Sequence, residues 1–136
     1  MTEDSKDIIE QDLNKAINFL GQNKFSEAES ICNQILKEKD NSDAYHILSS
    51  IKLYKQEFNQ SIELVNKSIE INSENPGYYV TLGCAHSASK DYKNSIKAFK
   101  KAISLNNKVA QVHFYLGESY RKLKKYNDAI ASFYRT

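Results

Sequence analysis

The chain has 136 residues and a formal net charge of +2, with 40% hydrophobic and 26% charged residues, a composition typical of a globular protein. No stretch approaches the roughly 18 consecutive apolar residues of a membrane-spanning helix, and residues 1–5 lack the basic and apolar regions of a secretory signal. We therefore expect a cytoplasmic protein with no membrane partner.

Apolar side chains recur at three- and four-residue intervals along most of the chain, the spacing that places them on one face of an α-helix. Short polar segments rich in asparagine interrupt this pattern. In chain order we expect helices over residues 5–21, 25–38, 42–55, 58–71, 76–89, 92–105, 110–123 and 126–136. The links within successive pairs are short, so paired helices should run antiparallel.

Three of these helices begin near a residue whose side-chain oxygen can accept a backbone N–H. We expect Ser5, Ser42 and Asn75 to act as N-terminal caps. Pro76 fits the first helical position, where its missing N–H leaves no hydrogen bond unmade.

The same residue types return every 34 residues. Leucine stands at positions 48, 82 and 116, an aromatic ring at 58, 92 and 126, and isoleucine at 62, 96 and 130. A fixed period of this length predicts a solenoid of stacked units. Each unit then contains a first helix, A, and a second helix, B.

Small residues recur in the A helix of each unit, at Ser49, Gly83 and Gly117. They predict a close approach between helices A and B, and we expect the large rings at positions 58, 92 and 126 to fill the adjoining space. Cys32 falls in a slot that holds apolar residues in later units, so we expect a small core residue there.

These recurring positions resemble the tetratricopeptide repeat, which combines an aromatic residue, Leu-Gly, a second aromatic, and later Ala and Phe at fixed intervals. The matching residues are Tyr79, Leu82, Gly83, Phe99 and Ala102 in one unit and Leu116, Gly117, Tyr120, Ala129 and Phe133 in the next. The resemblance implies an all-α, right-handed solenoid of antiparallel helix pairs, with about four repeats and eight helices. A single domain over residues 1–136 would hold repeats at about 8–41, 42–75, 76–109 and 110–136, the first degenerate and the last truncated.

The resemblance also implies a non-catalytic scaffold for protein–protein interaction. In this family the A helices line a concave groove that binds a peptide or protein segment, so the partner is expected to be a protein of unknown identity. The implied groove residues are His46, Ser50, Tyr54, Val80, Thr81, Cys84, Phe114, Tyr115, Glu118 and Arg121. Phe114 and Tyr115 either anchor the partner or pack against a further unit.

No catalytic motif stands out. The three histidines do not form a metal-ligand pattern, and His113 occupies the slot of Tyr45 and Tyr79, which indicates a packing residue. We expect no enzymatic activity, no metal and no cofactor. An RNA-binding pentatricopeptide array is the rival interpretation, but the strict 34-residue period and an acidic N-terminal half argue against a nucleic-acid partner.

The charge is unevenly distributed. Residues 1–75 carry 14 acidic and 8 basic side chains, whereas residues 76–136 carry 3 and 11. A basic stripe is expected on one helix, at Lys93, Lys97, Lys100 and Lys101. It is either a solvated surface or a contact for an acidic partner, including the acidic first unit of another copy.

The last expected helix stops short of its counterparts, which would leave Ile130 and Phe133 poorly covered. Either the chain is the front part of a longer protein, or it associates with another chain through its open end. The opening segment is similar to bacterial arrays that precede glycosyltransferase domains. The alternative function is therefore an N-terminal docking module of a larger bacterial enzyme, with the catalytic domain beyond Thr136.

Overall fold

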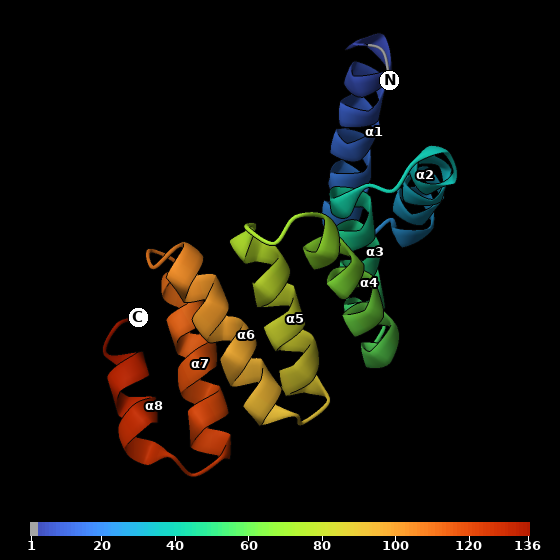
Figure 1. Cartoon of the computed structure of the whole chain (residues 1–136). Coiled ribbons are helices and arrows are strands. Elements are labelled where there is room, and N and C mark those ends of the chain that lie inside the picture. Colours follow the sequence, from blue (N-terminus) through green and yellow to red (C-terminus); the bar gives the residue numbers. More distant parts are fainter. Residues whose placement is uncertain (1–2) are drawn as a thin grey trace. The chain divides into compact units, whose positions relative to one another are not determined.

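The structure is a computed structural model that describes residues 3–136. Within that range the chain forms eight α-helices and no strand (Figure 1). The helices are α1 (Glu3–Gly21), α2 (Phe25–Glu38), α3 (Ser42–Tyr54), α4 (Phe58–Ile71), α5 (Pro76–Ala88), α6 (Tyr92–Leu105), α7 (Ala110–Lys122) and α8 (Tyr126–Phe133). The prediction of an all-α fold of paired helices is confirmed.

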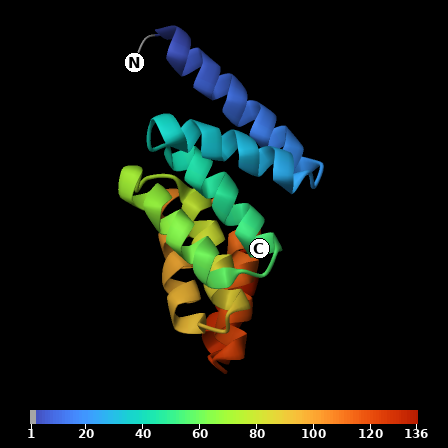
Figure 2. The same cartoon turned by 90° about the vertical axis from the view of Figure 1, so that its right-hand side faces the viewer.

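Consecutive helices pack as pairs, α1 with α2, α3 with α4, α5 with α6, and α7 with α8 (Figure 1, Figure 2). The odd-numbered members are the A helices and the even-numbered members the B helices. Two B helices also pack on the A helix of the next pair, α2 on α3 and α6 on α7. Each A–B pair therefore gains a second buried face from its neighbour, as stacked repeats require.

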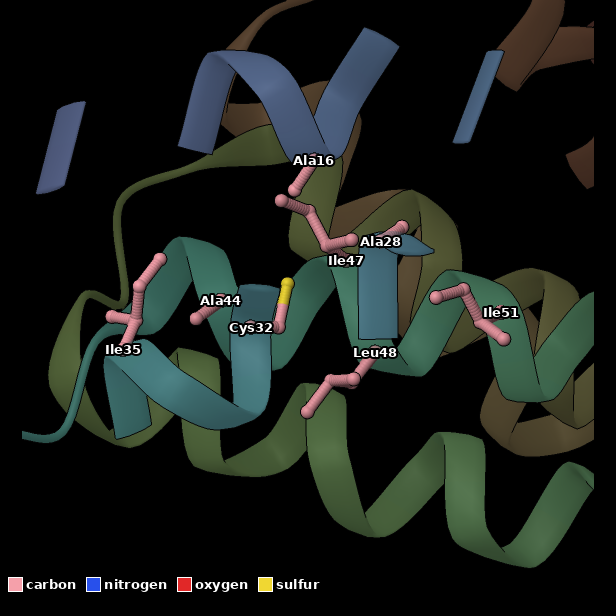
Figure 3. Packing of buried hydrophobic residues seen from close by; sticks show 8 residues of the cluster. All are labelled: Ala16, Ala28, Cys32, Ile35, Ala44, Ile47, Leu48 and Ile51. Atoms are coloured by element: carbon pink, nitrogen blue, oxygen red, sulfur yellow. The ribbon is translucent and has the colours of Figure 1, made fainter. Parts of the chain in front are cut away.

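The helices group into two compact units, Met1–Ile71 and Asn72–Thr136. In the first, alanines and isoleucines from α1, α2 and α3 form the core, and Cys32 is fully buried among them (Figure 3). Burial raises the pKa of this thiol to about 12. The expectation that Cys32 is a core residue is confirmed.

The core of the second unit comes from α5 to α8. Phe99 of α6 is almost fully buried, and Val112, Leu116 and Tyr120 of α7 pack around it. Burying such large apolar side chains contributes about 1.5–3 kcal/mol each, and this holds α7 between α6 and α8.

The structure corrects two helix caps and one helix end. Asn41, not Ser42, caps α3, since its Oδ1 accepts the N–H of Ala44 at 2.9 Å. Ser5 lies inside α1, which already includes Glu3, and α8 ends at Phe133 rather than at 136. Asn75 caps α5 as expected, its Oδ1 accepting the N–H of Gly77 at 2.9 Å.

The rings against the small A-helix residues are not those expected from the sequence. A Cβ atom added to Gly83 would lie 2.5 Å from the Phe99 ring, and one added to Gly117 would lie 2.5 Å from the Phe133 ring. Tyr126, one of the expected rings, is 57% exposed. Phe133, expected to be poorly covered, is half-buried because its ring lies against Gly117.

The first unit makes the same A–B contact with hydrogen bonds. Ser49 Oγ donates to the Ser61 carbonyl at 2.7 Å, and Ser61 Oγ donates to the Ser49 carbonyl at 2.9 Å. Both serines are fully buried. The reciprocal bonds satisfy both hydroxyls. At the 34-residue period Ser49 stands in the place of Gly83, and the buried Val65 stands in the place of Phe99.

Candidate peptide-binding faces

The ten residues expected to bind a peptide form two groups. His46, Ser50 and Tyr54 lie on α3 of the first unit, and the other seven lie on α5 and α7 of the second. We call these groups the α3 face and the α5/α7 face. Each is described within its own unit.

On the α5/α7 face, α5 contributes Val80, Thr81 and Cys84, all half-buried. Val80 and Cys84 pack against the core of the second unit. Burial raises the pKa of the Cys84 thiol to about 11, so this sulfur is protonated at neutral pH and is a weak nucleophile. The α5 side of the face is therefore a mostly apolar wall.

The α7 side is aromatic. The Phe114 ring lies 5.8 Å from the Phe133 ring and 6.3 Å from the Tyr115 ring, between centroids. Tyr115 in turn lies 5.7 Å from Phe99. Phe114 is nonetheless 43% exposed, so one of its surfaces is held by neighbouring rings while the other is open to a partner.

Sequence reasoning missed the residues that hold these rings in place. Gln111 Nε2 donates to the Tyr115 hydroxyl at 3.1 Å, one helical turn away, and Phe99 and Phe133 support the rings from the B helices. The four-residue spacing of Gln111 and Tyr115 could have indicated their hydrogen bond, because residues at that spacing are neighbours on a helix. Nothing in the sequence alone indicates which B-helix ring meets which A-helix ring.

The two charged residues of the α5/α7 face pair with each other. Arg121 Nε and Nη2 donate to the two carboxylate oxygens of Glu118 at 3.1 and 2.9 Å. The hydrogen bonds from Arg121 lower the pKa of Glu118. This exposed, two-pronged pair leaves little net charge at this point of the face.

The α3 face is more polar. Ser50 Oγ donates to the His46 carbonyl of its own helix at 3.0 Å. Tyr54 is 65% exposed, but its ring centroid lies 4.7 Å from that of Phe25 on α2. Burial lowers the pKa of His46, against the opposing effect of Asp43, so this imidazole is neutral at pH 7.

Among residues 3–136, no three His, Cys, Asp or Glu side chains come together in a group that could hold a metal ion. In the same range, no helix has the length and apolarity that a membrane crossing requires.

Family models of the tetratricopeptide repeat match residues 42–75 and 76–109, and a second model of this repeat matches residues 111–136. These matches include α3 to α8. They confirm the family that the recurring residues indicate. No curated protein sequence matches the chain.

Solved structures of MamA are similar to this fold. One crystal structure of MamA aligns with a TM-score of 0.85 and 19% identity over 93% of this chain and 75% of that one. MamA from residue 41 to its end, from Desulfovibrio magneticus RS-1, aligns with a TM-score of 0.83 and 16% identity over 93% and 72%. A structure of MamA AMB-1 aligns at 0.77 and 20% identity over 93% and 70%. At these identities the similarity concerns the fold alone.

Proposed function

The chain belongs to the tetratricopeptide repeat family, and on that basis we propose that it is a non-catalytic scaffold that binds a peptide or protein segment along its A helices. Repeats of this family are typically protein–protein interaction modules. Stacked helix pairs present an extended surface of many side chains, which suits an extended partner.

The observation that carries this proposal is the aromatic cluster on α7. Phe114 keeps 43% of its surface exposed while Phe133 and Tyr115 hold its ring. A ring already fixed in place loses little conformational entropy when a partner covers it. Aromatic residues of this kind commonly supply much of the binding energy in protein interfaces.

The other residues of the two faces have supporting roles in this proposal. Val80, Thr81 and Cys84 provide the apolar wall beside Phe114 and Tyr115, and Glu118 with Arg121 offers hydrogen-bonding edges to the partner backbone. His46, Ser50 and Tyr54 provide a second contact on the α3 face. The four-repeat division of a single domain, a cytoplasmic location and the absence of a nucleic-acid partner are parts of the same proposal.

The test is to isolate a partner by affinity capture on the full chain and then compare binding by variants. Phe114→Ala should weaken binding by at least about tenfold, or about 1.4 kcal/mol. Tyr134→Ala is the matched control, since it removes an aromatic ring that is 86% exposed on the turn after α8. Equal binding by Phe114→Ala and the unaltered chain would show that the partner does not use the α5/α7 face.

The alternative proposal is an N-terminal docking module of a larger bacterial enzyme such as a glycosyltransferase. It rests on the similarity of the opening segment to arrays placed before transferase domains. Any catalytic activity would then belong to the parent protein. The coding sequence after the Thr136 codon distinguishes the two proposals, since a transferase domain there favours the module and an immediate stop codon favours the free scaffold.

A further inference from the structure

A tyrosine and a basic side chain recur together in the repeats. The Tyr45 hydroxyl donates to Asp40 Oδ1 at 2.8 Å, and Lys67 Nζ lies 5.4 Å from the Tyr45 ring centroid. One repeat later, the Tyr79 hydroxyl donates to the Ser73 carbonyl at 2.9 Å, and Lys101 lies 5.9 Å from the Tyr79 ring. Each tyrosine thus ties its A helix to the loop before it and accepts a cation over its ring.

The third repeat breaks this pattern. The positions 34 residues further on hold His113 in place of the tyrosine and Arg135 in place of the lysine. His113 Nε2 lies 3.4 Å from the Asn107 carbonyl, at the weak limit of a hydrogen bond. An imidazole is smaller than a phenol ring, and it has no hydroxyl to reach as far as those of Tyr45 and Tyr79 do.

A pocket of about 280 Å³ lies at this place, between the B helices α6 and α8, with α7 as its floor. Ile103 and Leu116 give it an apolar lining, and His113 and Tyr120 are both nearly buried. The volume is just under the roughly 300 Å³ at which small-molecule pockets begin. It therefore suits a single side chain better than a whole cofactor.

The rim of the pocket is basic. Lys100 of α6 and Arg135, which follows α8, line it together with one carboxylate, Asp128. Lys100 is exposed, but its Nζ lies 5.7 Å from the Tyr120 ring centroid, so the ammonium group lies beside the pocket. The surrounding unit, residues 72–136, contains 11 basic and 4 acidic side chains. Both the rim and its surroundings therefore favour a negatively charged partner.

We propose that this pocket binds an aromatic side chain of an acidic peptide segment from a partner protein. The ring enters the slot that tyrosine fills in the two other repeats, beside Ile103 and Leu116, and Arg135 lies at its face as Lys67 and Lys101 do at Tyr45 and Tyr79. Carboxylates flanking the ring pair with Lys100 and Arg135. The site lies on the B-helix side of α7 and is distinct from the α5/α7 face.

The decisive variant is His113→Tyr, because it restores the residue of the other repeats and fills the slot from within. We expect it to fold at least as stably as the unaltered chain while losing the pocket. The probe is a fluorescein-labelled peptide EEYEE, with EEAEE as the peptide control, measured by fluorescence anisotropy. The unaltered chain should bind EEYEE at least about tenfold more tightly than EEAEE, and His113→Tyr should remove that difference.

Lys100→Gln and Lys101→Gln form a matched pair on the same helix. Each removes one positive charge beside a tyrosine ring, but only Lys100 lines the pocket. Lys100→Gln should weaken EEYEE binding several-fold, whereas Lys101→Gln should leave it unchanged. Equal losses in the two variants, equal binding of EEYEE and EEAEE, unchanged binding by His113→Tyr, or no saturable binding of EEYEE would each overturn the proposal.

Discussion

At the scale of single residues, the turns inside the helix pairs are built in an unusual way. Asn23, Gln56, Lys90 and Lys124 have positive φ angles of 59–67°. In each turn the N–H of the next residue donates to the carbonyl five residues back, for example from Asp91 to His86 at 2.8 Å. This is the Schellman motif, in which glycine is the usual residue because a side chain is strained at positive φ.

Lys90→Gly should therefore stabilise the protein by about 0.5–1 kcal/mol, since it relieves the left-handed strain while keeping the turn hydrogen bonds. Lys97→Gly, an exposed site inside α6, is the control and should destabilise by about 1 kcal/mol. Urea unfolding followed by circular dichroism measures both. If Lys90→Gly lowers the unfolding midpoint as Lys97→Gly does, the strain at Lys90 is negligible.

Histidine burial should make stability depend on pH. Burial lowers the pKa of His46 and of His86, although Asp43 and Asp91 oppose the effect. The unfolded chain, with an ordinary histidine pKa of 6.5, then takes up protons before the folded chain does. The stabilisation that comes from keeping these histidines neutral is therefore fully present above about pH 7. It decreases as the pH falls through 6.5 toward the lower pKa values of the folded chain.

His46→Gln should flatten part of this decrease between about pH 7 and pH 5, whatever its effect on stability at pH 7. The measurement is the free energy of unfolding in urea across that range. The carboxylates with lowered pKa values, Asp91 and Glu118, contribute only at more acidic pH. An identical slope in the variant and the unaltered chain would mean that His46 titrates normally.

At the scale of helices, the A–B contact of the second unit depends on a missing side chain. A Cβ atom on Gly83 would approach Phe99 Cε1 to 2.5 Å, whereas one on Gly21 would meet nothing within 4 Å. Phe99 is 1% exposed, so its ring has little room to move aside. The helices α5 and α6 can keep their present separation only with glycine at position 83.

Gly83→Ala should consequently destabilise the protein by about 1–3 kcal/mol through overpacking, with the loss seen as a lower thermal midpoint. Gly21→Ala makes the same chemical change in open space at the end of α1, and it should leave stability unchanged or slightly raise it. Equal midpoints for the two variants would contradict the close contact with Phe99.

At the scale of the whole molecule, the two compact units carry net charges of opposite sign. The unit Met1–Ile71 contains 13 acidic and 8 basic side chains, and the unit Asn72–Thr136 contains 4 and 11. Units with opposite net charges of this size attract each other across two molecules at low ionic strength. At 0.1 M salt this attraction is screened beyond about 10 Å. The distribution therefore favours association between the acidic unit of one copy and the basic unit of another.

Light scattering at low salt should accordingly give a mass above the 15.6 kDa of one chain that rises with protein concentration and returns to one chain at high salt. A matched sample in high salt at each concentration separates this effect from apolar association, which salt does not weaken. A constant mass of one chain under all conditions would leave the basic unit to a different acidic partner.

The family, the helix pairs and most helix ends could be predicted from the sequence, because they depend on local patterns. A 34-residue period and a three- to four-residue apolar spacing place side chains on helix faces without knowledge of their partners. Asn75 and Pro76 mark the start of α5 in the same way. The sequence also indicated correctly that Cys32 would be buried.

Only the tertiary structure decided which side chains meet across those faces. Phe99, not Tyr92, fills the space beside Gly83, and Glu118 and Arg121 of the expected groove pair with each other. The pocket beside His113 likewise depends on the fit of three helices around one smaller ring. A periodic pattern specifies the face on which a residue lies, but the shape and reach of neighbouring side chains determine its contacts.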